Sequence, residues 1–160
     1  MFSIYILIIY AGLLAYRPLR RFALAFAPWI IFVCCYDWMR FFPNYEFNPI
    51  DVQGLYDSEK NLFGIATWGG QKLTLSEYFS VHNCTPADLM AGFFYLCWVP
   101  VPLGFSFWLY YKRQYKWCIR FCLAFLFVNL LGFCGYYIHP AAPPWYVMEY
   151  GFKPILHTPG

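Results

Sequence analysis

The chain has 160 residues, of which 61% are hydrophobic and only 12% are charged, and its formal net charge is +3. Soluble domains carry about 25% charged residues, so this composition excludes a soluble globular domain and indicates an integral membrane protein. The sequence shows no basic face with a recognition motif, so we expect no nucleic-acid partner.

Four apolar stretches are candidates for membrane-spanning helices, because a helix needs about 20 apolar residues to cross a bilayer. They are residues 1–16, 22–42, 87–111 and 117–138. The first is short for a span. Pro100 and Pro102 are expected to kink the third near its middle, because each removes a backbone donor and crowds the preceding turn. The sequence thus predicts an all-α integral membrane fold with about four transmembrane helices.

The first stretch could instead be a signal peptide. It has no positively charged start, and its arginines follow the apolar run, so we favour an uncleaved span.

The basic residues predict the orientation of the spans. They lie in the two short connections, as Arg17, Arg20 and Arg21 in the first and Lys112, Arg113, Lys116 and Arg120 in the second. Short loops rich in Lys and Arg face the cytoplasm. The N-terminus, the segment 43–86 and the tail 139–160 are therefore expected on the extracytoplasmic side.

The extracytoplasmic segment 43–86 is rich in aromatic residues and is expected to form short interfacial helices. Residues 51–63 can form a helix with an apolar side that comprises Val52, Leu55, Tyr56 and Leu62. Thr74 and Glu77 fit a capping box that opens another helix. The segment is either a structural lid or a wall of a lipid site.

Asp37 and Arg40 end the second stretch and share a helix face, since they are three residues apart. They could be interfacial anchors, because long cationic side chains snorkel to the membrane surface. Alternatively, Arg40 binds a phosphate, for which its planar guanidinium is well suited, and Asp37 orients it.

His139 follows the last apolar stretch and precedes Pro140, which prevents the helix from running on. Pro143 and Pro144 predict an extended course for the chain that follows. A histidine at a span exit is either an interfacial polar residue or a member of a site, and Trp145 and Tyr146 could pack against a lipid or against partner helices. No nucleophile elbow, phosphate loop or metal-binding motif occurs, so we assign no catalytic residue, metal or cofactor.

Two segments carry a family resemblance. Residues 36–45, with Tyr36, Asp37 and Arg40, resemble the YDxxR-type segment of membrane inositol phosphorylceramide synthases, a branch of the type 2 phosphatidic-acid phosphatase superfamily. Residues 135–146 are similar to the Ala-Pro-Pro-Trp-Tyr element of that group, which is the more specific signal. Residues 97–103 also fit the bacterial branch.

The resemblance implies a six-helix membrane core whose site opens to the non-cytoplasmic side. It implies phosphoryl transfer from a phosphoinositide or other phospholipid to a ceramide-like acceptor, or to water in the phosphatase branch. The reaction would proceed through a phospho-histidine, without a metal.

In the family, the reactive histidines follow the Ala-Pro-Pro-Trp-Tyr element, and this chain ends before such segments. The resemblance therefore implies the N-terminal part of an enzyme, inactive without the missing C-terminal helices. It leaves substrate-binding roles only, for Asp37, Arg40, His139, Trp145 and Tyr146. The alternative is a non-catalytic multi-span membrane protein that acts as an accessory or assembly partner.

Overall fold

The computed structural model describes residues 2–153, so residues 154–160 of the predicted tail lie outside the described part. The chain divides into two compact units. Unit 1 comprises residues 1–43 and 93–134, and unit 2 comprises residues 44–92 and 135–160.

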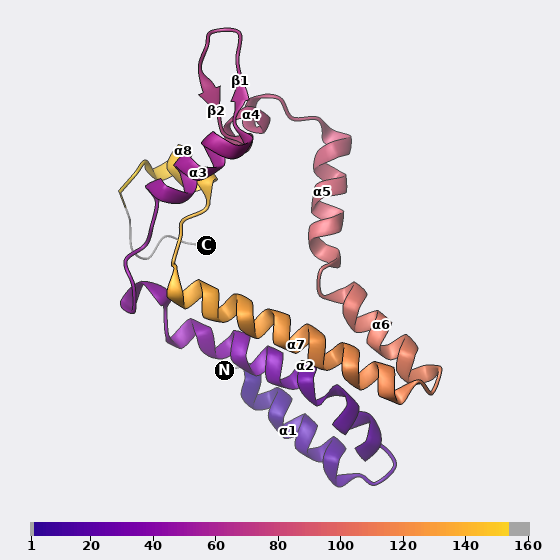
Figure 1. Ribbon diagram of the computed structural model, residues 1–160. Coiled ribbons are helices and arrows are strands. Elements are labelled where there is room, and N and C mark those ends of the chain that lie inside the picture. The colour runs from indigo at the N-terminus through magenta and orange to yellow at the C-terminus, as the bar shows by residue number, and fades with distance from the viewer. Residues whose placement is uncertain (1, 154–160) are drawn as a thin grey trace. The chain divides into compact units, whose positions relative to one another are not determined.

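Unit 1 is built from apolar helices. Its elements are α1 (Phe2–Ala15), α2 (Arg20–Trp38), the short 3-10 helix η1 (Met39–Phe41), the last turn of α5 (Thr85–Cys97), α6 (Pro100–Tyr111) and most of α7 (Tyr115–Ile138). The helices α1 and α2 lie side by side, and α7 lies along α2 (Figure 1). The Tyr10 hydroxyl donates to the Ala23 carbonyl oxygen at 3.0 Å, which ties α1 to α2.

The core of unit 1 lies between α2, α6 and α7. Its buried residues are Ala25, Phe26, Trp29, Phe32, Leu109, Cys118, Cys122 and Leu126. The Trp29 indole stacks on Phe125 with ring centroids 4.1 Å apart. Its Nε1–H donates to the Ser106 hydroxyl at 3.2 Å, so the one polar atom of this side chain has a partner inside the core.

The number of spans differs in part from the prediction. Within the described residues, α2 with η1 and α7 are each long and apolar enough to cross a membrane, and α5 with α6 makes a third candidate if the bent pair is one span. The helix α1 has 14 residues and is shorter than a span. The all-α membrane class is supported, but four full spans are not confirmed.

The predicted bend near the middle of the third stretch is present, as a break between two helices. α5 ends at Cys97, α6 begins at Pro100, and the two axes differ by 47°. Pro100 and Pro102 lie in the first turn of α6, where a missing backbone N–H costs least. The prolines therefore start a new helix, which is why the bend lies just before them.

Unit 2 holds the short elements of the predicted extracytoplasmic segment. They are the 3-10 helix η2 (Asn44–Glu46), α3 (Gln53–Phe63), β1 (Ile65–Ala66), β2 (Lys72–Leu73), α4 (Leu75–Val81), most of α5, and α8 (Pro144–Tyr150). The helix α8 packs against α3 and α4.

Two local predictions for unit 2 can be checked directly. The capping box of α4 is confirmed, because the Thr74 hydroxyl accepts from the Glu77 N–H and the Glu77 carboxylate accepts from the Thr74 N–H. The predicted apolar side of α3 is buried only in part. Val52 and Tyr56 are buried, whereas Leu55 and Leu62 are exposed.

A small β-hairpin was not predicted, so the all-α description is incomplete. β1 and β2 pair antiparallel, with Ile65 opposite Leu73 and Ala66 opposite Lys72. Gly70 has a φ of 75°, a conformation that residues with a side chain rarely adopt, and it closes the turn between the strands. Each strand has two residues, too few for an alternating pattern to be visible in the sequence.

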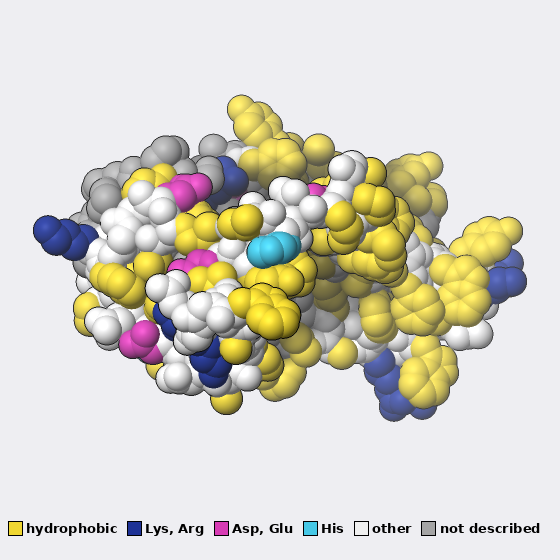
Figure 2. All heavy atoms as spheres, turned by 90° about the horizontal axis from the view of Figure 1, so that it is seen from above, with side chains coloured by type: hydrophobic (Ala, Val, Ile, Leu, Met, Phe, Trp, Pro, Cys, Tyr) yellow, Lys and Arg dark blue, Asp and Glu magenta, His cyan; other side chains and the backbone are white. Residues whose placement is uncertain are grey.

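Large apolar side chains cover much of the surface. Figure 2 shows hydrophobic side chains over much of the visible face. Helices α1, α5, α6 and α7 each include large apolar residues with half or more of their surface exposed. Exposure of such continuous apolar helix surfaces to water is unfavourable, whereas these surfaces are stable in lipid. The chain is accordingly an integral membrane protein.

Candidate functional site

The end of α7 is held by two asparagine side chains. Pro140 has no N–H to donate to the carbonyl oxygen of Tyr136 four residues earlier. The Asn44 side chain donates to that oxygen at 3.2 Å, and Asn48 donates to the carbonyl oxygen of Tyr137 at 2.7 Å. We call residues 44–54 together with residues 135–150 the His139 platform.

The backbone of the platform is closed by a short parallel bridge between Asp51 and Ala141. The Asp51 N–H donates to the Pro140 carbonyl oxygen at 2.8 Å, and the Ala142 N–H donates to the Asp51 carbonyl oxygen at 2.9 Å. Pro140 and Ala142 are buried in this contact. The segment after α7 is therefore fixed to the start of α3, and His139 is the first residue of that segment.

The Asp51 carboxylate faces two groups. Its Oδ1 accepts from the Gly54 N–H at 2.7 Å, which satisfies a free donor in the first turn of α3. Its Oδ2 lies 3.4 Å from Nε2 of His139. A Cβ at position 54 would collide with this carboxylate, so a larger residue there would require the Asp51 side chain to shift.

His139 is the accessible member of this pair, because its side chain is 67% exposed while that of Asp51 is 33% exposed. A carboxylate beside one ring nitrogen orients an imidazole and fixes which nitrogen carries the proton. The other nitrogen, Nδ1, is then the one that can meet a substrate oxygen. The arrangement can position a polar group and transfer a proton.

The proline pair does not continue an extended chain, and that prediction is wrong. Pro143 is extended, with ψ at 150°, but Pro144 is the first residue of α8. Proline is well suited to this position, because the first helical N–H has no intrahelical partner in any case. Residues 144–150 therefore form a helix that packs Tyr146, Val147 and Tyr150 against the platform core and leaves Trp145, Met148 and Glu149 exposed.

Trp145 and Tyr146 lie on different sides of α8. Tyr146 is buried in the platform core with Val52 and Ala142, and its hydroxyl donates to the Lys153 carbonyl oxygen at 3.3 Å. Trp145 is 48% exposed. Of the two predicted substrate-binding residues, Trp145 is thus the one available for contact with a lipid. Tyr146 is buried and packs in the core of the platform.

Asp37 and Arg40 lie in unit 1, at the end of α2 and in η1. Asp37 is buried, and its Oδ2 accepts from the Ser3 N–H at 3.0 Å, in the first turn of α1. No ion pair joins Asp37 to Arg40 in the described part of the chain. Arg40 is exposed. Asp37 therefore holds α1, while the guanidinium of Arg40 is accessible.

A polar network supports α3 and α4 beside the platform. The Tyr56 hydroxyl donates to the Glu77 carboxylate at 2.7 Å and accepts from the Lys60 ammonium at 3.3 Å. Burial raises the pKa of the Tyr56 hydroxyl, and its bond to Glu77 adds to this. Burial acts to raise the pKa of Glu77 too, but hydrogen bonds from the Thr74 backbone and the Tyr56 hydroxyl bring it below the ordinary value.

The structure brings His139 and α8 onto one platform, and it adds three residues that the sequence did not identify as site residues, Asp51, Asn44 and Asn48. A weak signal for Asp51 existed, since an acidic residue before an amphipathic helix is a typical cap. Nothing in the sequence indicated its contact with His139. Among residues 2–153, no group of three or more His, Cys, Asp or Glu side chains could hold a metal ion.

A phosphoinositol dihydroceramide synthase from Bacteroides thetaiotaomicron is 57% identical to this chain over all 160 residues. The chain covers 51% of that protein, so it spans about half the length of the curated relative. No family model and no solved structure matches the present chain. The resemblance inferred from residues 36–45 and 135–146 is confirmed, because the chain is similar over its whole length to a phosphoinositol dihydroceramide synthase.

Proposed function

We propose that this chain is the N-terminal part of a membrane enzyme that transfers a phosphoinositol group from a phospholipid to a ceramide-like lipid. The observation that carries the proposal is the 57% identity to a phosphoinositol dihydroceramide synthase over the whole chain. The match covers all 160 residues, so it spans both segments of the platform as well as the apolar helices.

The proposed chemistry is a two-step transfer. A histidine attacks the phosphorus of the donor phosphodiester, and the diacylglycerol oxygen leaves with a proton. The ceramide hydroxyl then attacks the phospho-histidine and loses its proton to a base, which frees the histidine. In this proposal the nucleophile belongs to the half of the relative that this chain does not match, and the present residues position the lipids.

The His139 platform is proposed as a wall of the substrate site. His139 is exposed and Asp51 faces its Nε2, so the free Nδ1 can accept a hydrogen bond from a lipid hydroxyl. The exposed Trp145 offers an indole surface to an acyl chain. Arg40, in unit 1, is a separate candidate for contact with a phosphate, because its guanidinium is not paired with a carboxylate in the described residues.

We also propose that the platform faces the extracytoplasmic side. This orientation is supported by seven basic residues, which lie in the α1–α2 turn, in the α6–α7 turn and at the start of α7. Short loops rich in Lys and Arg remain in the cytoplasm.

The function can be tested in a chimera. The stretch of the Bacteroides thetaiotaomicron protein that matches this chain is replaced by these 160 residues. Membranes with the chimera are given phosphatidylinositol and a fluorescent dihydroceramide, and the product is identified by mass spectrometry. We expect phosphoinositol dihydroceramide to form. A chimera that inserts normally but forms none, while the parent protein does, would refute the proposal.

A further inference from the structure

One end of unit 1 carries most of the positive charge of the protein. Seven of the eleven Lys and Arg residues lie in or beside the α1–α2 and α6–α7 turns, namely Arg17, Arg20, Arg21, Lys112, Arg113, Lys116 and Arg120. The two turns adjoin each other, since the Phe22 and Tyr110 rings are 5.3 Å apart. Figure 2 shows Lys and Arg side chains among hydrophobic ones at this end.

No acidic residue neutralises these charges. Residues 2–36 and 89–138 contain no Asp or Glu. Within residues 2–153, the only ion pair joins His139 to Asp51, so none of the seven cations is paired with a carboxylate. The end of the unit is therefore an uncompensated positive field, which attracts anions at the membrane surface.

An aromatic groove opens beside these cations, between α6 and α7. Its volume is about 440 Å³, and its lining includes Phe105, Trp108, Trp117 and Phe121. The polar side chains in the lining are Gln114 and Arg120. The guanidinium of Arg120 lies over the Trp117 ring, 5.4 Å from its centroid, which holds the cation at the groove. The apolar walls suit the acyl chain of a phospholipid, and the cation of Arg120 suits its phosphate.

We propose that this groove binds an anionic phospholipid, with an acyl chain against the aromatic wall and the phosphate on Arg120. The charge of the surrounding turns decides between lipids, because it favours a headgroup with net negative charge over a zwitterionic one. Arginine suits the phosphate, since its planar fork donates two hydrogen bonds at once. The site shares no residue with the His139 platform and does not depend on the proposed transferase activity.

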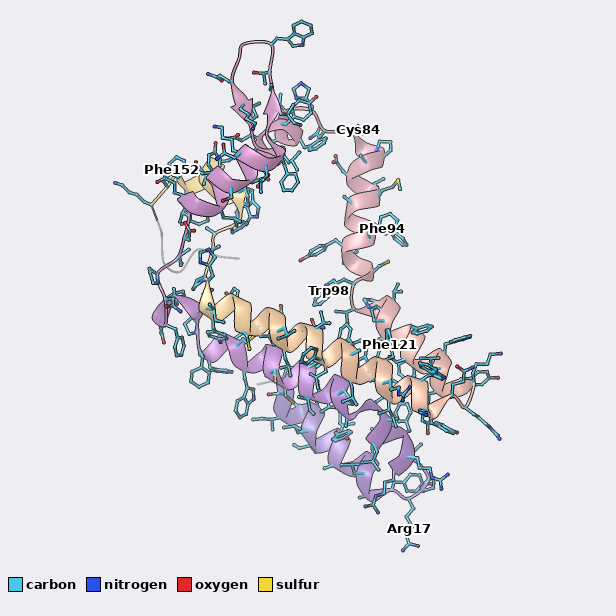
Figure 3. The ribbon with its side chains drawn as sticks, viewed as in Figure 1. Arg17, Cys84, Phe94, Trp98, Phe121 and Phe152 are labelled. Carbon is cyan, nitrogen blue, oxygen red and sulfur yellow. The ribbon has the colours of Figure 1, made fainter. Side chains whose placement is uncertain are left out.

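The test measures lipid binding to the purified 160-residue chain in detergent by native mass spectrometry, with phosphatidylglycerol or phosphatidylcholine of matched chains. Arg120→Gln removes the groove cation. Arg17→Gln makes the same charge change outside the groove, and Figure 3 shows Arg17 projecting from the α1–α2 turn, away from Phe121 of the groove. Both arginines are exposed, so both variants are expected to fold.

We expect phosphatidylglycerol to bind more tightly than phosphatidylcholine. Arg120→Gln should weaken phosphatidylglycerol binding about fivefold, equivalent to about 1 kcal/mol, and Arg17→Gln less than about twofold. Equal binding of the two lipids would overturn the proposal. An equal loss in both variants would also overturn it, because binding would then follow net charge and not the groove.

Discussion

The Oδ2 atom of Asp51 lies 3.4 Å from Nε2 of His139, although the two residues come from segments far apart in the chain. This contact is possible because Asp51 and Ala141 are paired as a parallel bridge, which fixes the start of α3 against the segment after α7. Asp51 thus stabilises a helix start and orients an exposed histidine with one carboxylate.

The two roles of Asp51 can be separated by two substitutions. Asp51→Ala removes the cap and should speed hydrogen exchange of the Gly54 amide about fivefold, since a lost cap costs about 1 kcal/mol. Asp51→Asn keeps a capping oxygen and should leave this amide protected, while it removes the charge beside His139. Asp57→Asn, on the exposed side of α3, is the control. Equal exchange rates at Gly54 in the Asp51→Ala variant and the parent chain would show that Asp51 does not cap α3.

The stability of α4 should depend on pH through Glu77. Its folded-state pKa is below the ordinary value, so its stabilising contribution is present above that ordinary value and is lost as pH falls through the folded pKa. Hydrogen exchange in the first turn of α4 should therefore quicken on acidification. Glu77→Gln should remove this dependence, and a variant that keeps the full dependence would contradict the assignment.

Ser106 should couple to Trp29 in the core of unit 1. Ser106→Ala leaves the buried indole N–H without its partner, which costs about 1 kcal/mol in a membrane core. In a Trp29→Phe background the same change should cost less, by about 0.6 kcal/mol. Unfolding in detergent followed by circular dichroism measures both costs, with Ser58→Ala as an exposed control. The same cost in both backgrounds would mean that the bond contributes nothing.

Arg40→Ala should lower phosphoinositol transfer in the chimera by about tenfold or more, because a charge-assisted contact to a phosphate contributes about 1.5–3 kcal/mol. Membrane insertion should be unchanged, since Arg40 is exposed. Arg20→Ala, at the other end of α2, should have little effect on transfer. Unchanged transfer in the Arg40 variant would remove this residue from the substrate site.

The sequence predicts features whose causes lie close together in the chain. The Thr74–Glu77 capping box and the long apolar helices α2 and α7 are of this kind. The bend at Pro100 is another such feature. Proline chemistry alone was ambiguous at Pro144, because the same residue continues an extended chain or opens a helix.

Other features depend on contacts between distant segments and could not be predicted. The Asn44 contact with the Tyr136 carbonyl oxygen and the pairing of Asp51 with Ala141 join the segment after α2 to the end of α7. The sequence left open whether Asp37 orients Arg40 or anchors the helix end, and its carboxylate accepts from the Ser3 N–H in α1. In each case a local pattern shows that a polar group is present, while tertiary packing selects its partner.

The most direct test of the proposed site is the transfer activity of a His139→Ala chimera, with phosphatidylinositol as donor and dihydroceramide as acceptor. The matched control is His82→Ala, which removes an exposed histidine that stacks on Tyr78 of α4. Because the His139 side chain is 67% exposed, its loss should leave insertion and platform hydrogen exchange unchanged. We predict at least about a tenfold fall in transfer for His139→Ala and none for His82→Ala. Full transfer by the His139 variant would contradict the account.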